Sequence, residues 1–254
     1  MIGIPQLVRR IPRELFFGIV VAEIRPHQHE FLEAFSEKCG VPLLIQPRVG
    51  SEHYTDFVRS LKRINPDLIL IHSYSMIVRE EVLSLCDVVN IHGALLPQYR
   101  GANPIQWAIL NNEHETGVTM HYVDAGIDTG DIIAQYKVPM FLEDTWVTIY
   151  NRIFSAADHL IATEVPKLLS GTNKRIPQDE RIAKHWSRRT PEDGLINWDE
   201  SVLHIYNLIR ALVKPHPGAF YISKTGDKII IDEYCTIDDV IDLKYKHDRG
   251  LLHD

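Results

Sequence analysis

Short apolar runs that alternate with helical patterns constrain the fold of this chain more than any other feature. Four runs rich in β-branched residues lie at residues 16–24, 41–46, 66–74 and 87–92. Segments with apolar side chains at helical spacing separate them, at residues 27–40, 51–65 and 79–85. Continuous apolar strands of this kind are typical of a parallel sheet that helices cover on both faces. The sequence therefore predicts an α/β fold with a doubly wound, mostly parallel sheet.

The chain beyond residue 92 predicts further elements of several kinds. We expect helices at 103–113, 144–171 and 201–213, paired strands at 116–124 and 130–140, and a hairpin at 220–234 with a glycine in its turn. A polar stretch at 172–194 contains two prolines and predicts a linker. These features predict a main domain at residues 1–182 and a small C-terminal subdomain at 183–254, made of linker, helix and β-hairpin.

The start of the chain departs from this pattern. Doubly wound folds usually begin with a strand and a glycine-bearing turn. Ahead of the first apolar run, this chain offers only the short stretch MIGIPQL. The first strand of the sheet is therefore absent, very short, or encoded upstream of the start.

Composition limits the partners and the compartment that we expect. The 254 residues include 27 Lys and Arg against 34 Asp and Glu, a formal charge of −7, which disfavours a nucleic-acid partner. The three cysteines form no CxxC pair and suit a reducing compartment. No apolar run approaches the roughly 20 residues that span a bilayer, and charged residues interrupt the N-terminal stretch. We therefore expect a cytoplasmic protein with no membrane partner.

The fourth apolar run ends with two polar residues, Asn90 and His92. Ligands of open parallel sheets bind at the carboxyl ends of the strands. Side chains at i and i+2 face the same side of a strand, so the amide and the imidazole can converge on one atom. Together they could stabilise an oxyanion, and His92 could also carry a proton. The alternative is a pair of polar residues that only caps a strand.

A second polar cluster lies in the loop between the paired strands. Asp124, Asp128 and Asp131 alternate there with Gly126 and Gly130. Glycines let the backbone approach a planar ligand, and one buried carboxylate could orient His92. The alternative is an acidic hairpin tip exposed to water.

Two stretches, NIHGALLPQYRGANPIQW and ETGVTMHYVDAGIDTGDIIAQ, together resemble the folate-dependent formyltransferase family. The family pattern is Asn-x-His-x-x-Leu-Leu-Pro, then Gly-x-Thr-x-His, then Asp-x-Gly. The resemblance runs from about residue 26 to residue 221 and includes SRRTPEDGLINW and NLIRALVKPHPGAFY. It assigns residues 1–182 to the catalytic domain, and it implies that Asn90, His92 and Asp128 are catalytic.

The resemblance also implies a co-substrate, N10-formyltetrahydrofolate, and no metal. The histidines show no zinc-ligand pattern such as HExxH. By the resemblance, the folate lies near a set of residues at three places in the chain: Ser75, Met76, Ile77, Leu96, Pro97, Asp124, Ala125, Gly126 and Ile127.

The branch of the family decides which amine is formylated. The tRNA branch normally carries a C-terminal β-barrel, for which the roughly 30 residues after Tyr221 are too few. A sugar nucleotide, such as a dTDP-, UDP- or GDP-amino-deoxyhexose of lipopolysaccharide O-antigen biosynthesis, fits best. Its expected contacts are Arg100, Gln106, Trp107, Arg210 and Tyr221. The alternatives are a methionyl-tRNA formyltransferase or a non-catalytic relative that binds folate or nucleotide. We also expect a possible homodimer through the C-terminal hairpin.

Overall fold

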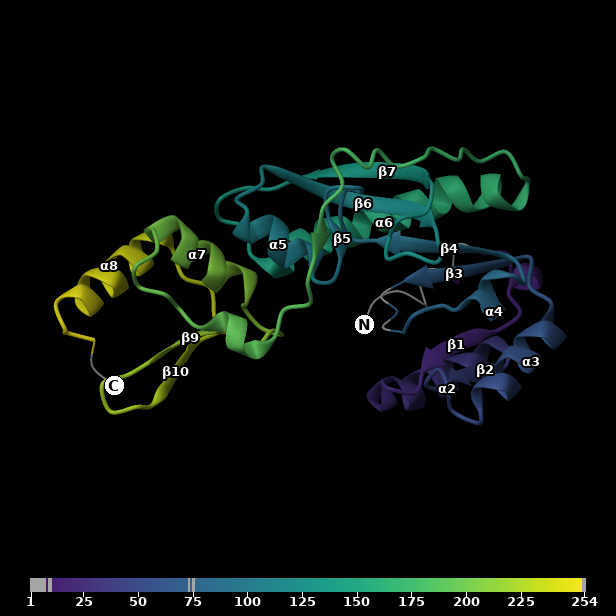
Figure 1. The fold of residues 1–254 in the computed structure, drawn as a ribbon, viewed down its shortest axis with the longest axis horizontal. Helices are drawn as coiled ribbons and strands as arrows, with labels where there is room; N and C mark the ends of the chain where they lie inside the picture. The colour runs from purple at the N-terminus through teal and green to yellow at the C-terminus, as the bar shows by residue number, and fades with distance from the viewer. Residues whose placement is uncertain (1–7, 9–10, 73, 75, 253–254) are drawn as a thin grey trace. The chain divides into compact units, whose positions relative to one another are not determined.

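The computed structural model describes residues 8, 11–72, 74 and 76–252, which form two compact units (Figure 1). The first unit contains Met1–His92, Thr119–Gln135 and Ala157–Gln178. The second contains Gly93–Val118, Tyr136–Ala156 and Asp179–Asp254. Among the described residues, no helix is long and apolar enough to cross a membrane. The division predicted at residue 182 stays a prediction.

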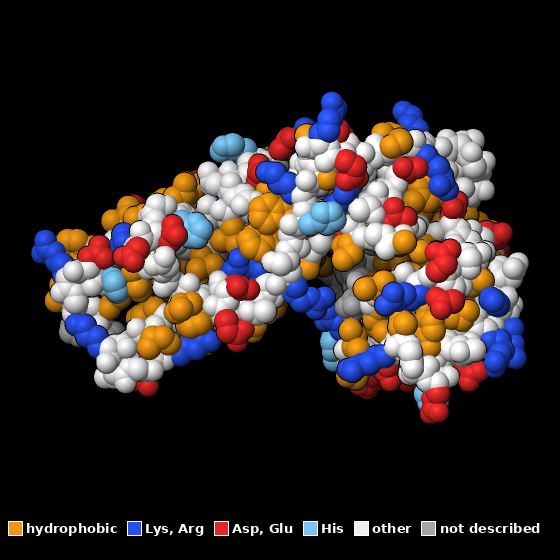
Figure 2. Space-filling view, viewed as in Figure 1, with side chains coloured by type: hydrophobic (Ala, Val, Ile, Leu, Met, Phe, Trp, Pro, Cys, Tyr) orange, Lys and Arg blue, Asp and Glu red, His pale blue; other side chains and the backbone are white. Residues whose placement is uncertain are grey.

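Charges of both signs share the surface. On the face drawn in Figure 2, Lys and Arg side chains are interspersed with Asp and Glu side chains. Exposed apolar side chains are also present in the described part of the chain, among them Ile127 and Ile230. The mixed pattern agrees with the small acidic excess of the sequence.

The first unit begins with the four predicted strands and their helices. The strands are β1 (Ile19–Ala22), β2 (Leu43–Gln46), β3 (Leu68–His72) and β4 (Asp87–His92). A short helix, η1 (Arg13–Leu15), precedes β1, and between the strands lie η2 (Pro26–Gln28), α2 (His29–Cys39), α3 (Tyr54–Ile64) and α4 (Glu80–Leu83). Gly40 ends α2 in the left-handed conformation, at φ +62°, as its position after the apolar pattern predicted. The predicted α/β fold class is confirmed.

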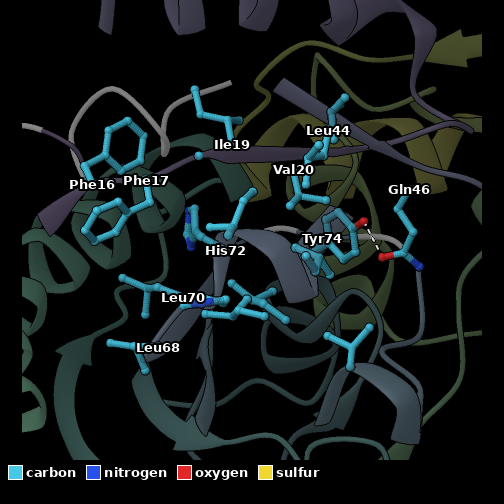
Figure 3. Close-up of a pocket in the computed structure, with 18 of the residues that line it drawn as sticks. Phe16, Phe17, Ile19, Val20, Leu44, Gln46, Leu68, Leu70, His72 and Tyr74 are labelled. Carbon is cyan, nitrogen blue, oxygen red and sulfur yellow. Dashed lines mark hydrogen bonds between the residues drawn. The ribbon is translucent and has the colours of Figure 1, made fainter. Parts of the chain in front are cut away.

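The strands of the first unit form two separate sheets. One contains β1 and β2, which are parallel. The other has the order β3-β4-β6-β7, with β6 at Glu115–Tyr122 and β7 at Ile132–Pro139, each of which contributes residues to both units. In it β3 and β4 are parallel, whereas β4 and β6 are antiparallel. A cavity of about 280 Å³ lies between β1 and β3 (Figure 3). The expectation about a first strand falls partly on residues 1–7, which lie outside the described residues.

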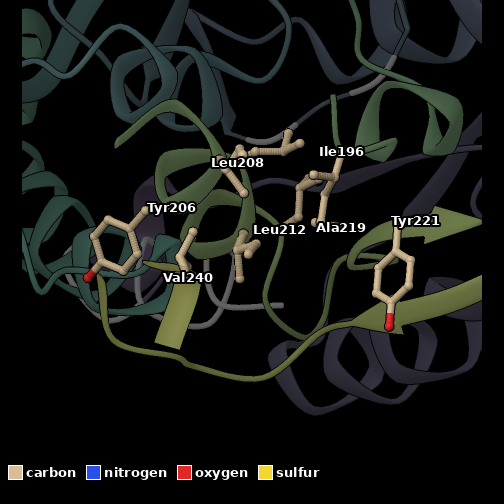
Figure 4. Close-up of a cluster of buried hydrophobic side chains, with 9 residues drawn as sticks. Ile196, Tyr206, Leu208, Leu212, Ala219, Tyr221 and Val240 are labelled. Carbon is tan, nitrogen blue, oxygen red and sulfur yellow. The ribbon is translucent and has the colours of Figure 1, made fainter. Parts of the chain in front are cut away.

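The second unit has its own core. Its elements are α5 (Pro104–Leu110), α7 (Val202–Ala211), β9 (Ala219–Ile222), β10 (Lys228–Ile231) and α8 (Ile237–Asp248). Helix α6 (Trp146–Leu169) contributes residues to both units. Side chains of α7, β9 and α8 gather in one cluster that includes Tyr206, Ala219 and Val240 (Figure 4). The core of this unit is therefore built by helices against one face of a small hairpin.

The predicted hairpin is confirmed, because β9 and β10 pair antiparallel and Gly226 turns between them at φ +92°. Pairing of two copies through this hairpin stays a prediction. Helix α8 was not predicted. Its start carries a capping box, in which Thr236 and Asp239 each bond the other's backbone N–H.

The stretch predicted as a linker, 172–194, contains ordered structure. Within it, β8 (His185–Trp186) pairs in parallel with β5 (Arg100–Gly101), and η3 (Pro191–Gly194) follows. The Trp186 ring stacks on Tyr99 at 5.5 Å between ring centres. A two-residue strand has no periodicity, so the polar composition concealed it.

Candidate active site

Four polar side chains share one face of the strand pair β4 and β6. Asn90 lies directly opposite His121, and His92 lies opposite Thr119. Alternate residues of a strand face the same side, and directly opposed residues of an antiparallel pair are neighbours. The register therefore brings the two predicted residues of β4 together with a second histidine. All four belong to the first unit.

His121 orients the amide of Asn90. The Nδ1 of His121 lies 2.7 Å from the backbone oxygen of Tyr122, and this contact requires Nδ1 to carry the proton. The Nε2 of the neutral ring is then an acceptor for the Nδ2 of Asn90, at 3.1 Å. That bond uses one N–H of the amide. It also fixes the orientation of the Asn90 amide, because the nitrogen and not the oxygen must face His121.

The charge state of His121 follows from its burial. The residue is 1% exposed, and burial lowers the pKa of its imidazole to about 4, with the nearby His92 as the second cause. His121 is therefore neutral near pH 7 and keeps its acceptor role. The sequence analysis noted this histidine in the Gly-x-Thr-x-His pattern but gave it no role. No signal in the sequence gave it one, because its contact with Asn90 depends on the pairing of its strand with β4.

Asp128 lies between the two histidines. One carboxylate oxygen is 3.5 Å from Nδ1 of His92, and the other is 3.6 Å from Nε2 of His121. These separations exceed ordinary hydrogen-bond lengths, so the contact is electrostatic. The side chains of His92 and Asp128 are only 8% and 15% exposed, which limits screening by water. The structure thus brings Asn90, His92 and Asp128 together.

Gln178 fixes the loop that carries Asp128. Its Nε2 donates to the backbone oxygens of Asp128, at 2.8 Å, and Gly130, at 2.7 Å. Asp128 has φ +55°, a conformation that Asp tolerates better than most residues. At Gly130 a Cβ would come within 2.1 Å of the Tyr122 oxygen, so glycine is required there. Sequence reasoning missed Gln178 because it lies in the polar stretch predicted as a linker.

Asp124 has a different role in the same loop. Its Oδ1 accepts hydrogen bonds from the backbone N–H of Gly126, at 3.0 Å, and from the hydroxyl of Thr129, at 2.5 Å. One oxygen of this carboxylate is therefore used to shape the loop. The geometry agrees with the choice of Asp128, rather than Asp124, as the partner of His92.

The residues expected near the folate lie in both units. Met76 and Ile77 follow β3 in the first unit, and Ile77 is 59% exposed. The stretch 124–127 belongs to the same unit, is exposed throughout, and ends at Ile127, which is 60% exposed. Leu96 and Pro97 are buried in the second unit. Ser75 lies outside the described residues. Folate contact stays a prediction for all of them.

The two arginines expected to contact the substrate are buried in the second unit and hold internal contacts. The Arg100 guanidinium donates to both carboxylate oxygens of Glu180, at 2.9 and 2.6 Å. Arg210 donates to Asn207 Oδ1 and to the backbone oxygen of Asp144, each at 2.8 Å. Glu180 is exposed, so a ligand anion could compete for Arg100. Substrate binding by either arginine stays a prediction.

The other three expected substrate contacts are also in the second unit. Trp107 lies between the Trp186 ring, at 4.9 Å, and the Arg189 guanidinium, at 5.1 Å. Gln106 is 3% exposed, and its Oε1 has no hydrogen-bond partner among the described residues. Tyr221 packs in the core cluster shown in Figure 4. Their roles in binding stay predictions.

Metal sites are absent from the described part of the chain, because nowhere in it do three His, Cys, Asp or Glu side chains lie close enough together to hold a metal ion.

Solved structures of other proteins share the fold of this chain. A sugar N-formyltransferase from a Shewanella species has a TM-score of 0.67 at 19% identity, over 87% of this chain and 98% of that chain. HypX from Aquifex aeolicus, solved with tetrahydrofolic acid, has a TM-score of 0.64 at 20% identity, over 84% of this chain and 37% of that chain. At these identities the likeness shows the shared fold.

Sequence comparison identifies the family. The bifunctional polymyxin resistance protein ArnA of Wigglesworthia glossinidia brevipalpis is 34% identical over 219 residues, or 84% of this chain. The chain spans about a third of the length of that curated relative, 33%. The formyl transferase family model matches residues 18–165, and the model of the formyl transferase C-terminal domain matches residues 188–237. The chain therefore belongs to the formyl transferase family.

Proposed function

We propose that this protein transfers the formyl group of N10-formyltetrahydrofolate to the primary amine of an amino-deoxy sugar nucleotide. The observation that carries the proposal is the convergence of Asn90, His92 and Asp128 on one face of β4 and β6. Family membership and a folate-bound structural neighbour support the co-substrate. The folate supplies the formyl carbon.

The side chains have separate roles in the proposed reaction. The neutral amine attacks the formyl carbon, and negative charge develops on the formyl oxygen. One N–H of the Asn90 amide donates to His121. The second N–H stabilises the formyl oxygen together with His92. Nδ1 of His92 faces Asp128, and we assign Nε2 to the reacting atoms. His92 takes the amine proton and returns it to N10 as the bond between N10 and the formyl carbon breaks.

Asp128 stabilises the positive charge that His92 carries between these two proton transfers. The two groups are 3.5 Å apart and largely buried, so their attraction is stronger than it would be in water. His121 stays neutral and keeps Asn90 oriented. The products are tetrahydrofolate and an N-formylated acceptor.

Charge and similarity favour a small acceptor over tRNA. A tRNA enzyme must neutralise several phosphates, whereas this chain carries a net charge of −7 and shows interspersed charges in Figure 2. A diphosphate needs only one or two cations. The Shewanella neighbour is a sugar N-formyltransferase, which supports the same class of acceptor. The three free cysteines fit a reducing cytoplasm.

A screen of candidate acceptors tests the proposal. Purified protein is incubated with formyl-folate and a panel of dTDP-, UDP- and GDP-amino-deoxyhexoses, and products are read by mass spectrometry. We expect at least one sugar nucleotide to gain one formyl group, with equal release of tetrahydrofolate. The non-catalytic alternative predicts that folate or nucleotide binds and that no panel member, and no charged tRNA, is formylated.

A further inference from the structure

The loop that carries Asp128 spans residues 123–131, between β6 and β7. A backbone bond closes its base, because the N–H of Tyr122 donates to the oxygen of Asp131 at 2.9 Å. A polar cavity of about 240 Å³ lies against both stems of the loop, lined by Tyr122 and Asp124 on one stem and by Asp131 on the other. The stems thus border a polar cavity rather than packed apolar side chains, so contacts from outside the loop must help to hold them.

The segment after α6 contacts the stem that leads into β7. Residues 173–178 run past β7 in Figure 1, and Ile176 forms an antiparallel bridge with Ile132 at the start of that strand. The two backbone bonds of this bridge are 2.8 and 2.9 Å long. Two residues further along the chain, Gln178 donates to two backbone oxygens of the loop. These contacts hold the second stem at two points.

The same segment holds the first stem through Tyr122. The Nδ2 of Asn173 donates to the Tyr122 hydroxyl at 2.6 Å. The Arg175 guanidinium lies over the Tyr122 ring, 3.5 Å from its centre, in a cation–π contact. Tyr122 is 7% exposed, so its ring is held by its surroundings on the other side as well. Both stems of the loop are therefore held from one short segment.

Arg175 also joins this stem to the strand that carries the predicted catalytic residues Asn90 and His92. Its Nη2 donates to Oδ1 of Asp87 at 2.8 Å. Asp87 is the first residue of β4, the strand that pairs with the end of β6 at Tyr122. The ion pair is about half exposed and contributes little stability by itself. Its effect is to tie the start of β4 and the end of β6 to one guanidinium.

We propose that residues 173–178 form a clasp that sets the position of Asp128 beside His92, with Asn173 and Arg175 as positioning residues. This role rests on the proposed function, in which the Asp128 carboxylate stabilises the charge on His92. The carboxylate is 3.5 Å from Nδ1 of His92. Since attraction falls with distance, a shift of about 1 Å would weaken it by about a fifth. Asn173 and Arg175 act through Tyr122 and the loop.

Three variants test the clasp. Arg175→Ala removes the contacts with Tyr122 and Asp87, and Tyr122→Phe removes only the hydroxyl that accepts from Asn173. The matched control is Lys174→Ala, which takes the same charge from an exposed position of the same segment. We expect turnover to fall about fivefold in the first two variants, because small displacements of a catalytic group are costly, and to stay unchanged in the control.

Combination with Asp128→Asn shows whether Arg175 acts through the carboxylate. If it does, Arg175→Ala should change turnover by less than about twofold in that background, because the charge that the clasp positions is already gone. A general loss of stability would lower turnover in both backgrounds alike. The same fivefold loss with and without Asp128→Asn would therefore overturn the proposal.

A spectrum of the His92 ring gives a second measurement that needs no substrate. Histidine is labelled with nitrogen-15, and the resonances of His92 are identified by their absence in His92→Asn. We expect these resonances to shift in Arg175→Ala and in Tyr122→Phe, because the nearby carboxylate moves, and to stay in place in Lys174→Ala.

Unchanged His92 resonances in both clasp variants, or an equal shift in the control, would overturn the proposal. If Asp128→Asn has no measurable turnover, the spectrum alone decides. A wild type that formylates no acceptor would contradict the proposed function, and the spectrum would still show whether the clasp positions Asp128.

Discussion

The Nε2 of Gln178 donates to the backbone oxygen of Asp128 at 2.8 Å, and to that of Gly130 at 2.7 Å. One amide thus holds the loop on both sides of Thr129, from a segment that follows α6. Asp128 itself adopts φ +55°, so its carboxylate position depends on this loop conformation. The contact makes Gln178 a positioning residue for the carboxylate beside His92.

Replacing Gln178 should therefore disturb the site without touching the substrate. We expect Gln178→Ala to lower turnover about tenfold and the free energy of unfolding by about 1–2 kcal/mol, because two carbonyl oxygens lose their donor. Gln178→Glu should behave alike, since a carboxylate cannot donate. Steady-state kinetics and urea unfolding measure both effects. The control is Asp179→Ala, which removes a surface ion pair with Arg181 and the hydrogen bond from the Arg181 backbone N–H. Equal activity of Gln178→Ala and the control would show that Gln178 does not position the carboxylate of Asp128.

The second prediction concerns the groups that meet the formyl oxygen. We expect His92→Asn and Asn90→Ala each to lower turnover by about a hundredfold or more, which is the usual effect of losing an oxyanion donor. Folate affinity, measured by fluorescence titration, should change little. Near-normal turnover in either variant would show that the catalytic assignment is wrong.

The two carboxylates of the loop should differ in importance. Asp128→Asn keeps the shape but removes the charge 3.5 Å from His92, so turnover should fall while the fold is retained. In Asp124→Asn the side-chain oxygen can still accept from Gly126 and Thr129, so less activity should be lost. Turnover and circular dichroism of both variants decide the ranking. The opposite order would identify Asp124 as the partner of His92.

The lowered pKa of His121 predicts how the stability of the fold depends on pH. Burial lowers the pKa of His121 to about 4 in the folded protein, from an ordinary value of 6.5. As pH falls below 6.5, the unfolded chain takes up a proton at this site while the folded protein does not, so stability is lost between pH 6.5 and about 4. Between pH 7 and about 4.5, the wild type should lose roughly 2–3 kcal/mol more unfolding free energy than His121→Gln.

Urea unfolding of the two proteins at both pH values measures this difference. Parallel losses in the wild type and in His121→Gln would mean that His121 is not held neutral by burial. The comparison with the variant removes the contribution of titrating groups that do not interact with His121.

The sequence predicted local elements well and long-range contacts poorly. Strand β4 has the predicted bounds of 87–92, because a continuous apolar run between polar ends leaves little choice of limits. The i, i+2 spacing also placed Asn90 and His92 on one face. The roles of His121 and Gln178 could not be predicted, because they depend on strand register and on a bond between residues 50 apart in the chain. Strand β8 was missed because two residues show no periodicity. Helix α8 was missed although Ile237, Val240 and Ile241 lie at helical spacing behind a Thr236 capping box.

The central claim is the class of acceptor, and a direct competition tests it. The protein is given formyl-folate labelled with carbon-13 in the formyl group, the best amino-sugar nucleotide from the screen, and charged initiator methionyl-tRNA in the same reaction. Initial rates of label transfer to each acceptor are measured at low and at physiological salt, because phosphate-backbone binding weakens steeply with salt. We predict label in the sugar nucleotide at both salt concentrations and none in the tRNA. Label in the tRNA at a useful rate, with every amino-sugar nucleotide inert, would contradict the account.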